Sequence, residues 1–435
     1  MRGIVGLDVG SDAVSVCVLA GEDGRELVRR HEVVNSEIGA TQLTERLVAL
    51  AAAEAITEYR IGIEASSLYW WPLALHLSTN SVLPTTQVYA LNPKLVKDFR
   101  STFGALPKTD RHDAFLIAER IRFERGLPAP FAVDWRYEPL RRLTRLRVHL
   151  ASSLAREKNY FLTMLFLPFS GFVAAKPFDD PFSPTSWALL EEFTTDHLAR
   201  VPVEELVTYL QRHGRGQFND PMATATKVQQ AAKDSYHLHR TMDAPMRLVL
   251  GSTRATITTL QQQLKMVDAT IARELAGIPQ TVSSVPGLGA VWTAGLVAEI
   301  GMISRFADDA ALAQYAGLTW TVRESGHFQA EDTRMTKRGN TYLRYYLIEA
   351  ANSVREHCSE YGVYYQTKYA QTPKHAHKRA LVLTARKLVR LVDALLRTDT
   401  IYQPPEHRMT RKEATQPSAR RPARHHRTRP LSALS

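Results

Sequence analysis

Residues 2–20, RGIVGLDVGSDAVSVCVLA, decide the fold that is expected for the first part of the chain. Two β-rich apolar runs, GIVGLDV and AVSVCVLAG, are separated by the turn residues Gly-Ser-Asp. A third run, ELVRRHEVVN, follows a Glu-Asp-Gly turn. The pattern predicts three consecutive strands that meander at the start of an α/β domain.

Helices and strands alternate after these three runs. A helix is expected at about 41–57, where leucines recur on one face, and the short strand YRIGIEA follows it. A further helix, a strand around SVLPTTQVYAL and a helix from near Asn92 lead to the helix TDRHDAFLIAERIRF. A meander followed by such alternation is typical of an RNase H-like α/β domain, which is expected to span residues 1–130.

The remainder of the chain has a helical pattern. Residues 131–280 are expected to form a helical linker with a basic stretch at 141–158 and a coiled-coil-like helix at about 247–277. That helix either packs within the monomer or pairs two copies of the chain. Residues 281–400 predict a second, mostly α-helical domain, and the basic residues 401–435 predict a disordered tail.

Charge and composition narrow the class of partner. The formal net charge of +11 favours a polyanionic partner, and the 44% hydrophobic content is ordinary for a soluble protein. No apolar run approaches the ~20 residues of a membrane helix, so no membrane partner is expected. Because no signal-peptide layout is present and the two cysteines lie far apart, a cytoplasmic location is expected.

Four carboxylates occupy positions suited to a metal centre. Asp8 and Glu64 each follow an apolar strand-like run and precede small residues, while Asp110 and Asp113 share one face of a helix start in KTDRHDA. Each position has an ordinary alternative: a solvated strand end for the first two acids, and compensation of the helix dipole for the others. Together they favour a site for two Mg²⁺ (or Mn²⁺) ions acting on a phosphodiester.

A second group of motifs lies toward the C-terminus. Gly287 and Gly289, in PGLG before a helix, resemble a helix-hairpin-helix contact to a DNA backbone, although a simple turn between helices would look similar. Ser325 lies in a polar, Gly-containing segment between two helices, where its hydroxyl is expected to be exposed. The basic residues expected to contact phosphate near the following helix start are Lys337, Arg338 and Arg344.

These motifs resemble, in order, those of the DEDD-type insertion-sequence transposases of the IS110 family, relatives of the Piv DNA invertase. The matching blocks are D-x-G-S, I-G-I-E-A and K-T-D-R-H-D-A, then P-G-L-G, A-E-I-G, Y-A-G-L, S-G and T-K-R-G-N. The resemblance implies a RuvC-like domain with Asp8, Glu64, Asp110 and Asp113 as its tetrad. It also implies a C-terminal transposase domain whose nucleophile is Ser325.

The resemblance carries further expectations about partners. It implies a prokaryotic, nucleoid-associated homo-oligomer, a dimer or tetramer, that acts on donor and target DNA and is guided by a noncoding RNA. Two departures from the family pattern lie near the serine: Thr319-Trp320-Thr321 follows Y-A-G-L, and His327-Phe328 follows S-G. If Ser325 is not the nucleophile, the next candidates are Ser283, Ser284 and Ser304.

Three other classes of protein share parts of the pattern. The nearest is a RuvC-like structure-specific nuclease, in which water attacks and no covalent intermediate forms. A sugar-kinase-like ATPase shares the D-x-G-S opening, but the sequence lacks its second Gly-rich phosphate loop and its adenosine loop. An inactive nucleic-acid-binding module is disfavoured because all four acids are present.

Overall fold

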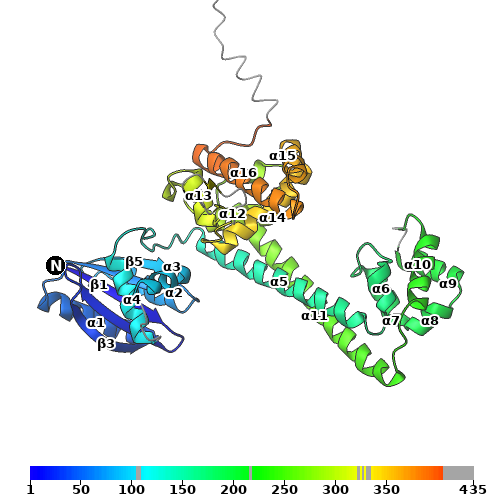
Figure 1. Ribbon diagram of the computed structural model, residues 1–435, viewed down its shortest axis with the longest axis horizontal. Helices are drawn as coiled ribbons and strands as arrows, with labels where there is room; N and C mark the ends of the chain where they lie inside the picture. Colours follow the sequence, from blue (N-terminus) through cyan, green and yellow to red (C-terminus); the bar gives the residue numbers. More distant parts are fainter. Residues whose placement is uncertain (104–108, 215–217, 321–323, 326–327, 330–334, 405–435) are drawn as a thin grey trace, which may run out of the picture. The chain divides into compact units, whose positions relative to one another are not determined.

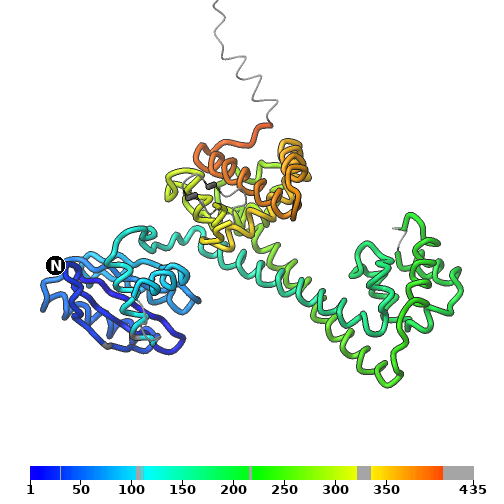
Figure 2. Tube along the Cα trace, in the orientation of Figure 1, coloured from blue at the N-terminus to red at the C-terminus, as the bar shows by residue number. Residues whose placement is uncertain are grey.

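The computed structural model describes residues 1–103, 109–214, 218–320, 324–325, 328–329 and 335–404 (Figures 1 and 2). The chain divides into two compact units. One contains residues 1–138, 280–287 and 299–435, and the other contains residues 139–279 and 288–298. Most of the predicted disordered tail, residues 405–435, lies outside the described residues.

A five-stranded mixed sheet forms the first part of the chain. Its strands are β1 (Arg2–Val9), β2 (Ala13–Ala20), β3 (Glu26–Val34), β4 (Glu58–Glu64) and β5 (Thr85–Leu91), in the spatial order β3-β2-β1-β4-β5. The β1–β2 and β2–β3 pairs are antiparallel, whereas β1–β4 and β4–β5 are parallel. This meander followed by parallel strands confirms the predicted RNase H-like class.

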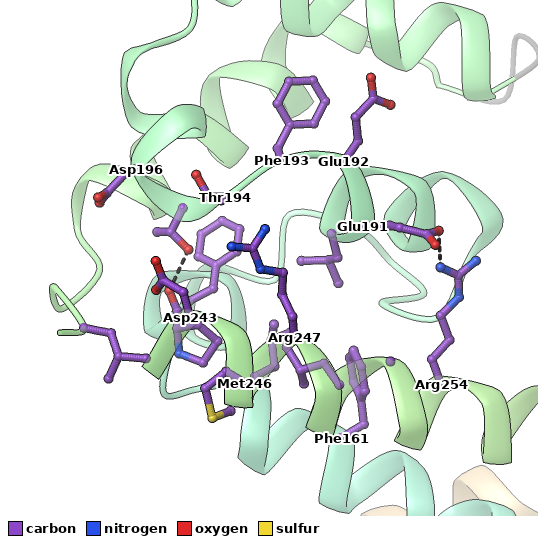
Figure 3. Close-up of a pocket in the computed structure, with 18 of the residues that line it drawn as sticks. Phe161, Glu191, Glu192, Phe193, Thr194, Asp196, Asp243, Met246, Arg247 and Arg254 are labelled. Atoms are coloured by element: carbon purple, nitrogen blue, oxygen red, sulfur yellow. Dashed lines mark hydrogen bonds and ion pairs between the residues drawn. The ribbon is translucent and has the colours of Figure 1, made fainter. Parts of the chain in front are cut away.

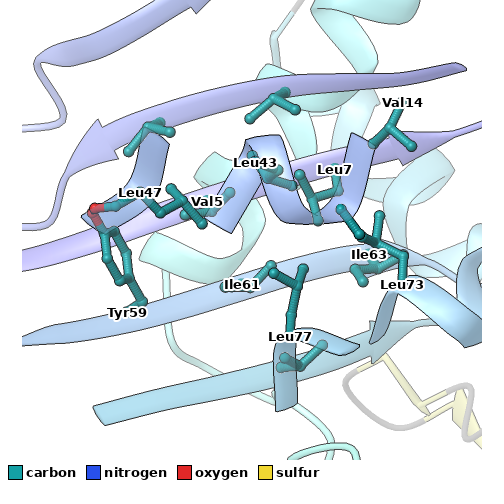
Figure 4. Packing of buried hydrophobic residues seen from close by; sticks show 14 of the residues in the cluster. Val5, Leu7, Val14, Leu43, Leu47, Tyr59, Ile61, Ile63, Leu73 and Leu77 are labelled. Carbon is teal, nitrogen blue, oxygen red and sulfur yellow. The ribbon is translucent and has the colours of Figure 1, made fainter. Parts of the chain in front are cut away.

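Alternation along the strands gives the sheet two apolar faces. On one face, Val5 and Leu7 of β1 pack with Ile61 and Ile63 of β4 beneath α1 (Glu37–Ala53) and α2 (Trp70–Thr79) (Figure 4). On the other face, Ile4 packs against α4 (Asp110–Arg122). Both predicted helices are present here, but α1 begins earlier than expected because Ser36 caps it, its Oγ accepting from the Gly39 amide at 3.2 Å.

Two glycines allow α4 to lie directly on the sheet. Gly6 of β1 and Gly62 of β4 are register partners in neighbouring parallel strands. A Cβ at Gly6 would lie 2.0 Å from the Ala114 carbonyl oxygen, and one at Gly62 would lie 2.5 Å from Cγ1 of Ile121. Because any side chain there would push the helix away, these positions fix how closely α4 approaches the strands.

The second unit is built on two long helices, α5 (Glu138–Leu165) and α11 (Asp243–Ala276). The chain runs out along α5 and returns along α11 (Figure 1), and Arg147 Nε donates to Asp268 Oδ1 at 2.6 Å between them. Shorter helices with their own core lie between the two in sequence: α6 (Ser170–Ala175), α7 (Pro184–Glu192), α8 (Thr195–Arg200), α9 (Val203–Gly214) and α10 (Pro221–Lys233).

A cavity of about 350 Å³ lies within this second unit (Figure 3). Its lining includes Phe161 and Met246, and the Arg247 side chain extends into it. At one end Arg254 forms an ion pair with Glu191. None of the motif residues described above lines this cavity.

The C-terminal elements are helical apart from one short hairpin. They are α12 (Ala290–Ile300), α13 (Asp309–Ala316), β6 (Glu324–Ser325), β7 (Phe328–Gln329), α14 (Thr341–His357), α15 (Ser359–Ala370) and α16 (Ala376–Thr398). Short elements that complete the described chain are α3 (Pro93–Arg100) and the 3-10 turns Ser101–Phe103, Arg240–Met242, Val282–Ser284 and Ile303–Arg305. The predicted mostly α-helical character of this region is confirmed. Within the described residues, no helix is both long and apolar enough to cross a bilayer.

Candidate active site

Strand alternation places Asp8 and Glu64 on the face of the sheet that α4 covers. Asp8 lies two residues after Gly6 and Glu64 two residues after Gly62, and these glycines are register partners on that face. Since β1 and β4 are parallel, their carboxyl ends meet at the same edge of the sheet. Both carboxylates therefore stand at one edge, beside the first turn of α4.

The first turn of α4 supplies a third acid to this edge. Thr109 caps the helix by accepting from the His112 amide at 3.4 Å, and Asp110 is the first helical residue. Burial, with the negative charges of Asp110 and Glu64 as smaller causes, raises the pKa of Asp8 from 3.8 to about 6. Asp110 and Glu64 are thus both close enough to Asp8 for their charges to act on it.

The fourth acid, Asp113, has a different partner. It forms an ion pair with Arg100 at the C-terminal end of α3. The ion pair runs from Arg100 Nη2 to Asp113 Oδ1, and the other terminal nitrogen of the guanidinium, Nη1, is buried without a hydrogen bond. The Arg100 guanidinium also lowers the pKa of Asp8, although less than burial and the neighbouring acids raise it. Nothing in the sequence singled out Arg100, because its approach to Asp113 is a tertiary contact.

The donor set suits a hard divalent cation. Among the described residues, no three His, Cys, Asp or Glu side chains stand close enough to hold a metal ion as they are arranged here. Carboxylate oxygens are nevertheless the ligands that Mg²⁺ prefers, and a cation would relieve the repulsion that raises the pKa of Asp8. Asp8, Glu64 and Asp110 could hold such an ion, and Asp113 could join them by exchanging Arg100 for the metal.

Asn35, at the end of the meander, ties together the loops that follow Asp8 and Glu64. Its Nδ2 donates to the Gly10 carbonyl at 2.9 Å and to the Tyr69 carbonyl at 3.3 Å. Gly10 lies in the turn after Asp8, and Tyr69 lies in the loop after Glu64. Sequence reasoning missed this residue, since a single Asn in a turn carries no distinctive signal.

The C-terminal motifs meet at Asn340, the last residue of T-K-R-G-N. Its Nδ2 donates to Oε2 of the buried Glu299 at 2.7 Å and to the Tyr315 hydroxyl at 3.2 Å. Its backbone amide donates to the Tyr315 carbonyl at 2.6 Å. Glu299 belongs to A-E-I-G and Tyr315 to Y-A-G-L, so three motifs that are separate in sequence join at one amide.

Glycines permit the close packing of these motifs. Gly339 has φ +142, and a Cβ there would lie 2.3 Å from the Tyr315 carbonyl oxygen.

Arg344, predicted to contact phosphate, is half-buried. It donates through Nη1 to the Ala316 carbonyl at 3.1 Å, and burial lowers its pKa. Its guanidinium is therefore engaged in a hydrogen bond within the fold of this packed region.

The segment that carries Ser325 begins and ends at this packed region. The Thr336 amide donates to the Thr319 carbonyl at 2.8 Å, which closes the base of the segment. Ser325 pairs with Phe328 through the backbone of the β6–β7 hairpin. The Ser325 side chain, and the departures at Thr321 and His327, lie outside what the structure describes.

The remaining predicted residues fall at turns. Gly287 has φ +92 and packs against α14, where a Cβ would lie 2.9 Å from the Ser353 carbonyl oxygen. Gly289 has no neighbouring atom within 4 Å of an added Cβ, so the space there is open. Lys337, with φ +52, and Arg338 are exposed in the turn before α14. Arg338 forms an ion pair with Asp98 at 3.0 Å, so of these two residues only the position of Lys337 is consistent with the predicted phosphate contact without a change of partner.

Comparisons with known proteins match both groups of motifs. The DEDD family of IS110 type, described as Transposase, matches residues 5–169, and the "Transposase IS116/IS110/IS902 family" matches residues 280–366. The chain is thus a transposase, an enzyme that cleaves DNA, whose N-terminal part matches a DEDD-type domain. Within that class it belongs to the IS110/IS116/IS900 family of transposases. Residues 170–279 and 367–435 lie outside both matches.

Relatives resemble long stretches of the chain. The 44.8 kDa protein of insertion element IS116 from Streptomyces clavuligerus is 28% identical over 312 residues, covering 68% of this chain and 73% of that protein. The 42 kDa protein of IS900 from Mycobacterium paratuberculosis is 24% identical over 404 residues, covering 92% and 96%. The structure of T. thermophilus RuvC with a Holliday junction substrate matches at 17% identity and a TM-score of 0.23, covering 30% of this chain and 100% of that chain.

Proposed function

We propose that this transposase cuts and rejoins donor and target DNA through a carboxylate-held metal centre and a covalent link to Ser325. The observation that supports it most is the shared position of Asp8, Glu64 and Asp110 at one edge of the sheet, with the pKa of Asp8 raised. Mg²⁺ or Mn²⁺, when bound, would stabilise the charge that develops on the attacking and leaving oxygens.

The protein's own groups hold and orient this centre. Gly6 and Gly62 let α4 approach, so Asp110 reaches the strand-end carboxylates. Asn35 holds the two loops beside them in place. Arg100 keeps Asp113 paired, and we propose that Asp113 leaves this pair when it becomes a metal ligand.

The proposed serine step conserves phosphodiester bonds. The Ser325 oxygen forms a bond to phosphorus while the scissile P–O bond breaks; the serine proton passes to solvent and the released sugar oxygen takes up a proton. In the second step a sugar hydroxyl attacks the phosphoserine and gives up its proton to solvent, while the P–O bond to serine breaks and the serine oxygen takes up a proton. Because one P–O bond forms for each that breaks, rejoining needs no ATP.

The family resemblance supports two partners in this proposal. A noncoding RNA would select donor and target DNA, and the net charge of +11 suits binding of nucleic acid. Two or four copies of the chain would act together, so that strands from two DNA molecules can be exchanged.

Metal-dependent cleavage tests the carboxylate centre. Asp8→Asn, Glu64→Gln, Asp110→Asn and Asp113→Asn are each expected to abolish strand cleavage while DNA binding in EDTA is retained. Asp12→Asn is the matched control, because Asp12 is an exposed carboxylate in the turn after Asp8. Full cleavage by Asp110→Asn would contradict the assignment. Cleavage that persists in Ser325→Ala would favour the alternative, a nuclease in which water attacks.

A further inference from the structure

The segment 361–392, which runs from α15 into α16, contains no Asp or Glu. Over the same residues it carries these cations: Lys368, Lys374, Lys378, Arg379, Arg386, Lys387 and Arg390. Most of this segment lies beyond residue 366, where the second family match ends. It is therefore a strongly basic feature that the family match does not account for.

Part of this charge is neutralised within the fold by acids from other elements. Asp309, at the start of α13, pairs with Arg386 at 2.8 Å and with Arg390 at 3.5 Å. Glu360 pairs with Lys387 at 2.8 Å. These pairs lie along α16 and leave its start as the most exposed group of cations.

The cations at this end are Lys374, Lys378 and Arg379, and together with the neighbouring His375 and His377 we call them the α16 basic surface. All five residues are exposed. His377 accepts or donates a hydrogen bond with the Tyr365 hydroxyl at 2.7 Å, which fixes the first turn against α15. The surface is thus a fixed part of the fold, with its lysines directed to solvent.

The helix polarity makes these cations unfavourable for folding. The N-terminal end of an α-helix is partially positive, so anions stabilise it and cations destabilise it. The first turn of α16 contains no acidic residue, and the N-cap position, His375, makes no side-chain hydrogen bond to the helix. Lysine at position 378 opposes the stability of α16, which suggests that it serves an external anion.

We propose that the α16 basic surface binds the phosphate backbone of duplex DNA. The proposal rests on the transposase function in one respect only, that DNA is the substrate. Exposed lysines at the N-terminal end of a helix provide charge and donors for phosphate without reading base sequence. The surface therefore contributes affinity and orientation along the duplex, while sequence selection lies elsewhere.

A charge reversal at Lys378 separates binding from folding. Lys378→Glu places an acid in the first turn of α16, so the thermal midpoint is expected to rise or stay unchanged while DNA affinity falls. The matched control is Lys233→Glu, because Lys233 is an exposed lysine in the last turn of α10. The same charge change there opposes the helix polarity, so it should lower the midpoint and leave DNA affinity unchanged.

Affinity is measured for the full chain by fluorescence anisotropy with a random-sequence duplex, in EDTA and over a range of salt concentrations. The logarithm of the DNA-binding constant is plotted against the logarithm of the salt concentration. The double variant Lys374→Gln/Lys378→Gln should reduce the magnitude of this slope by about 2, since each lysine–phosphate contact contributes about 0.9. A hairpin RNA of random sequence is measured in parallel. Equal DNA affinity and slope in wild type and both variants would overturn the proposal, as would a loss of RNA binding alone. Absence of DNA binding by the wild type would instead overturn the proposed function.

Discussion

The amide of Asn340 donates to the carboxylate of Glu299 at 2.7 Å, and Glu299 is only 1% exposed. The Asn340 Oδ1 meanwhile accepts from the amides of Tyr342 and Leu343 at 2.9 and 3.0 Å, so the same side chain caps α14. Donor and acceptor ends of one side chain thus connect the end of α12 to the start of α14. Since the Ser325 segment starts and ends at this packed region, the pair is expected to govern its position.

Exchanging the two functional groups tests this relationship. Asn340→Asp places a carboxylate against the buried Glu299 and should lower the free energy of unfolding by about 3 kcal/mol or more. Glu299→Gln/Asn340→Asp restores a donor and an acceptor in reversed order and keeps a good N-cap, so it should recover most of that loss. Urea unfolding measures both variants. A double variant no more stable than Asn340→Asp would show that the hydrogen bond is not the relevant contact.

The raised pKa of Asp8 predicts a pH-dependent destabilisation. A carboxyl whose pKa is raised from 3.8 to about 6 by folding contributes its full stability below pH 3.8 and loses it as the pH rises through 6. In EDTA, Asp8→Asn should therefore be more stable than the wild type at pH 7.5, by about 1–2 kcal/mol after screening by solvent. Near pH 4 the two proteins should be equally stable.

Thermal unfolding of the wild type and of Asp8→Asn between pH 4 and pH 7.5 provides the measurement. Adding Mg²⁺ to both proteins provides the control. Added Mg²⁺ should stabilise the wild type more than Asp8→Asn, because the variant lacks one ligand charge. A stability difference that is the same at pH 4 and pH 7.5 would show that the Asp8 charge is not destabilised by its surroundings.

Gly6 is expected to tolerate no side chain. Gly6→Ala forces α4 away from β1, because the new Cβ would lie 2.0 Å from the Ala114 carbonyl oxygen, and it should cost about 3 kcal/mol of stability. Gly251→Ala is the control: Gly251 lies within α11, and no atom lies within 4 Å of an added Cβ. That variant should be stabilised by about 0.5–1 kcal/mol. If both variants were equally stable in chemical unfolding, α4 would not pack against β1 as closely as described.

Arg100 is expected to compete with the metal for Asp113. Arg100→Gln leaves the half-buried Asp113 carboxylate without its ion-pair partner, so the variant should lose about 1–3 kcal/mol in EDTA. The increase in thermal midpoint on adding Mg²⁺ should then exceed that of the wild type, because no guanidinium has to be displaced. Arg122→Gln, which breaks the pair with Glu119 at the other end of α4, should show the wild-type increase. The same Mg²⁺ response in all three proteins would argue against Asp113 as a ligand.

Local pattern predicted the sheet and the positions of two acids, because strand alternation depends only on sequence. Asp8 and Glu64 could be paired since both follow apolar runs that end at small residues. Ser36 is a readable N-cap, yet the leucine pattern drew the expected start of α1 toward residue 41 instead. Arg100, Asn35 and Glu299 could not be predicted, because each acts through partners far away in the sequence.

Arg344 shows the limit of reading charge from sequence. An arginine near a helix start is equally suited to phosphate or to a carbonyl of its own fold, and only burial distinguishes the two. Ser325 has the same limitation, since a hydroxyl in a polar loop has no spacing signature of its own. Its assignment depends on the motifs around it, which makes direct chemical trapping necessary.

Trapping of a protein–DNA adduct tests the central claim most directly. A suicide substrate with a nick beside the cleavage point is incubated with wild type, Ser325→Ala and Asp110→Asn in Mg²⁺, and products are separated on a denaturing gel. We predict a covalent adduct for the wild type, attached at Ser325 by mass spectrometry, and none for either variant, with all three binding DNA equally in EDTA. Cleavage by the wild type without any adduct, or an adduct that persists in Ser325→Ala, would contradict the account.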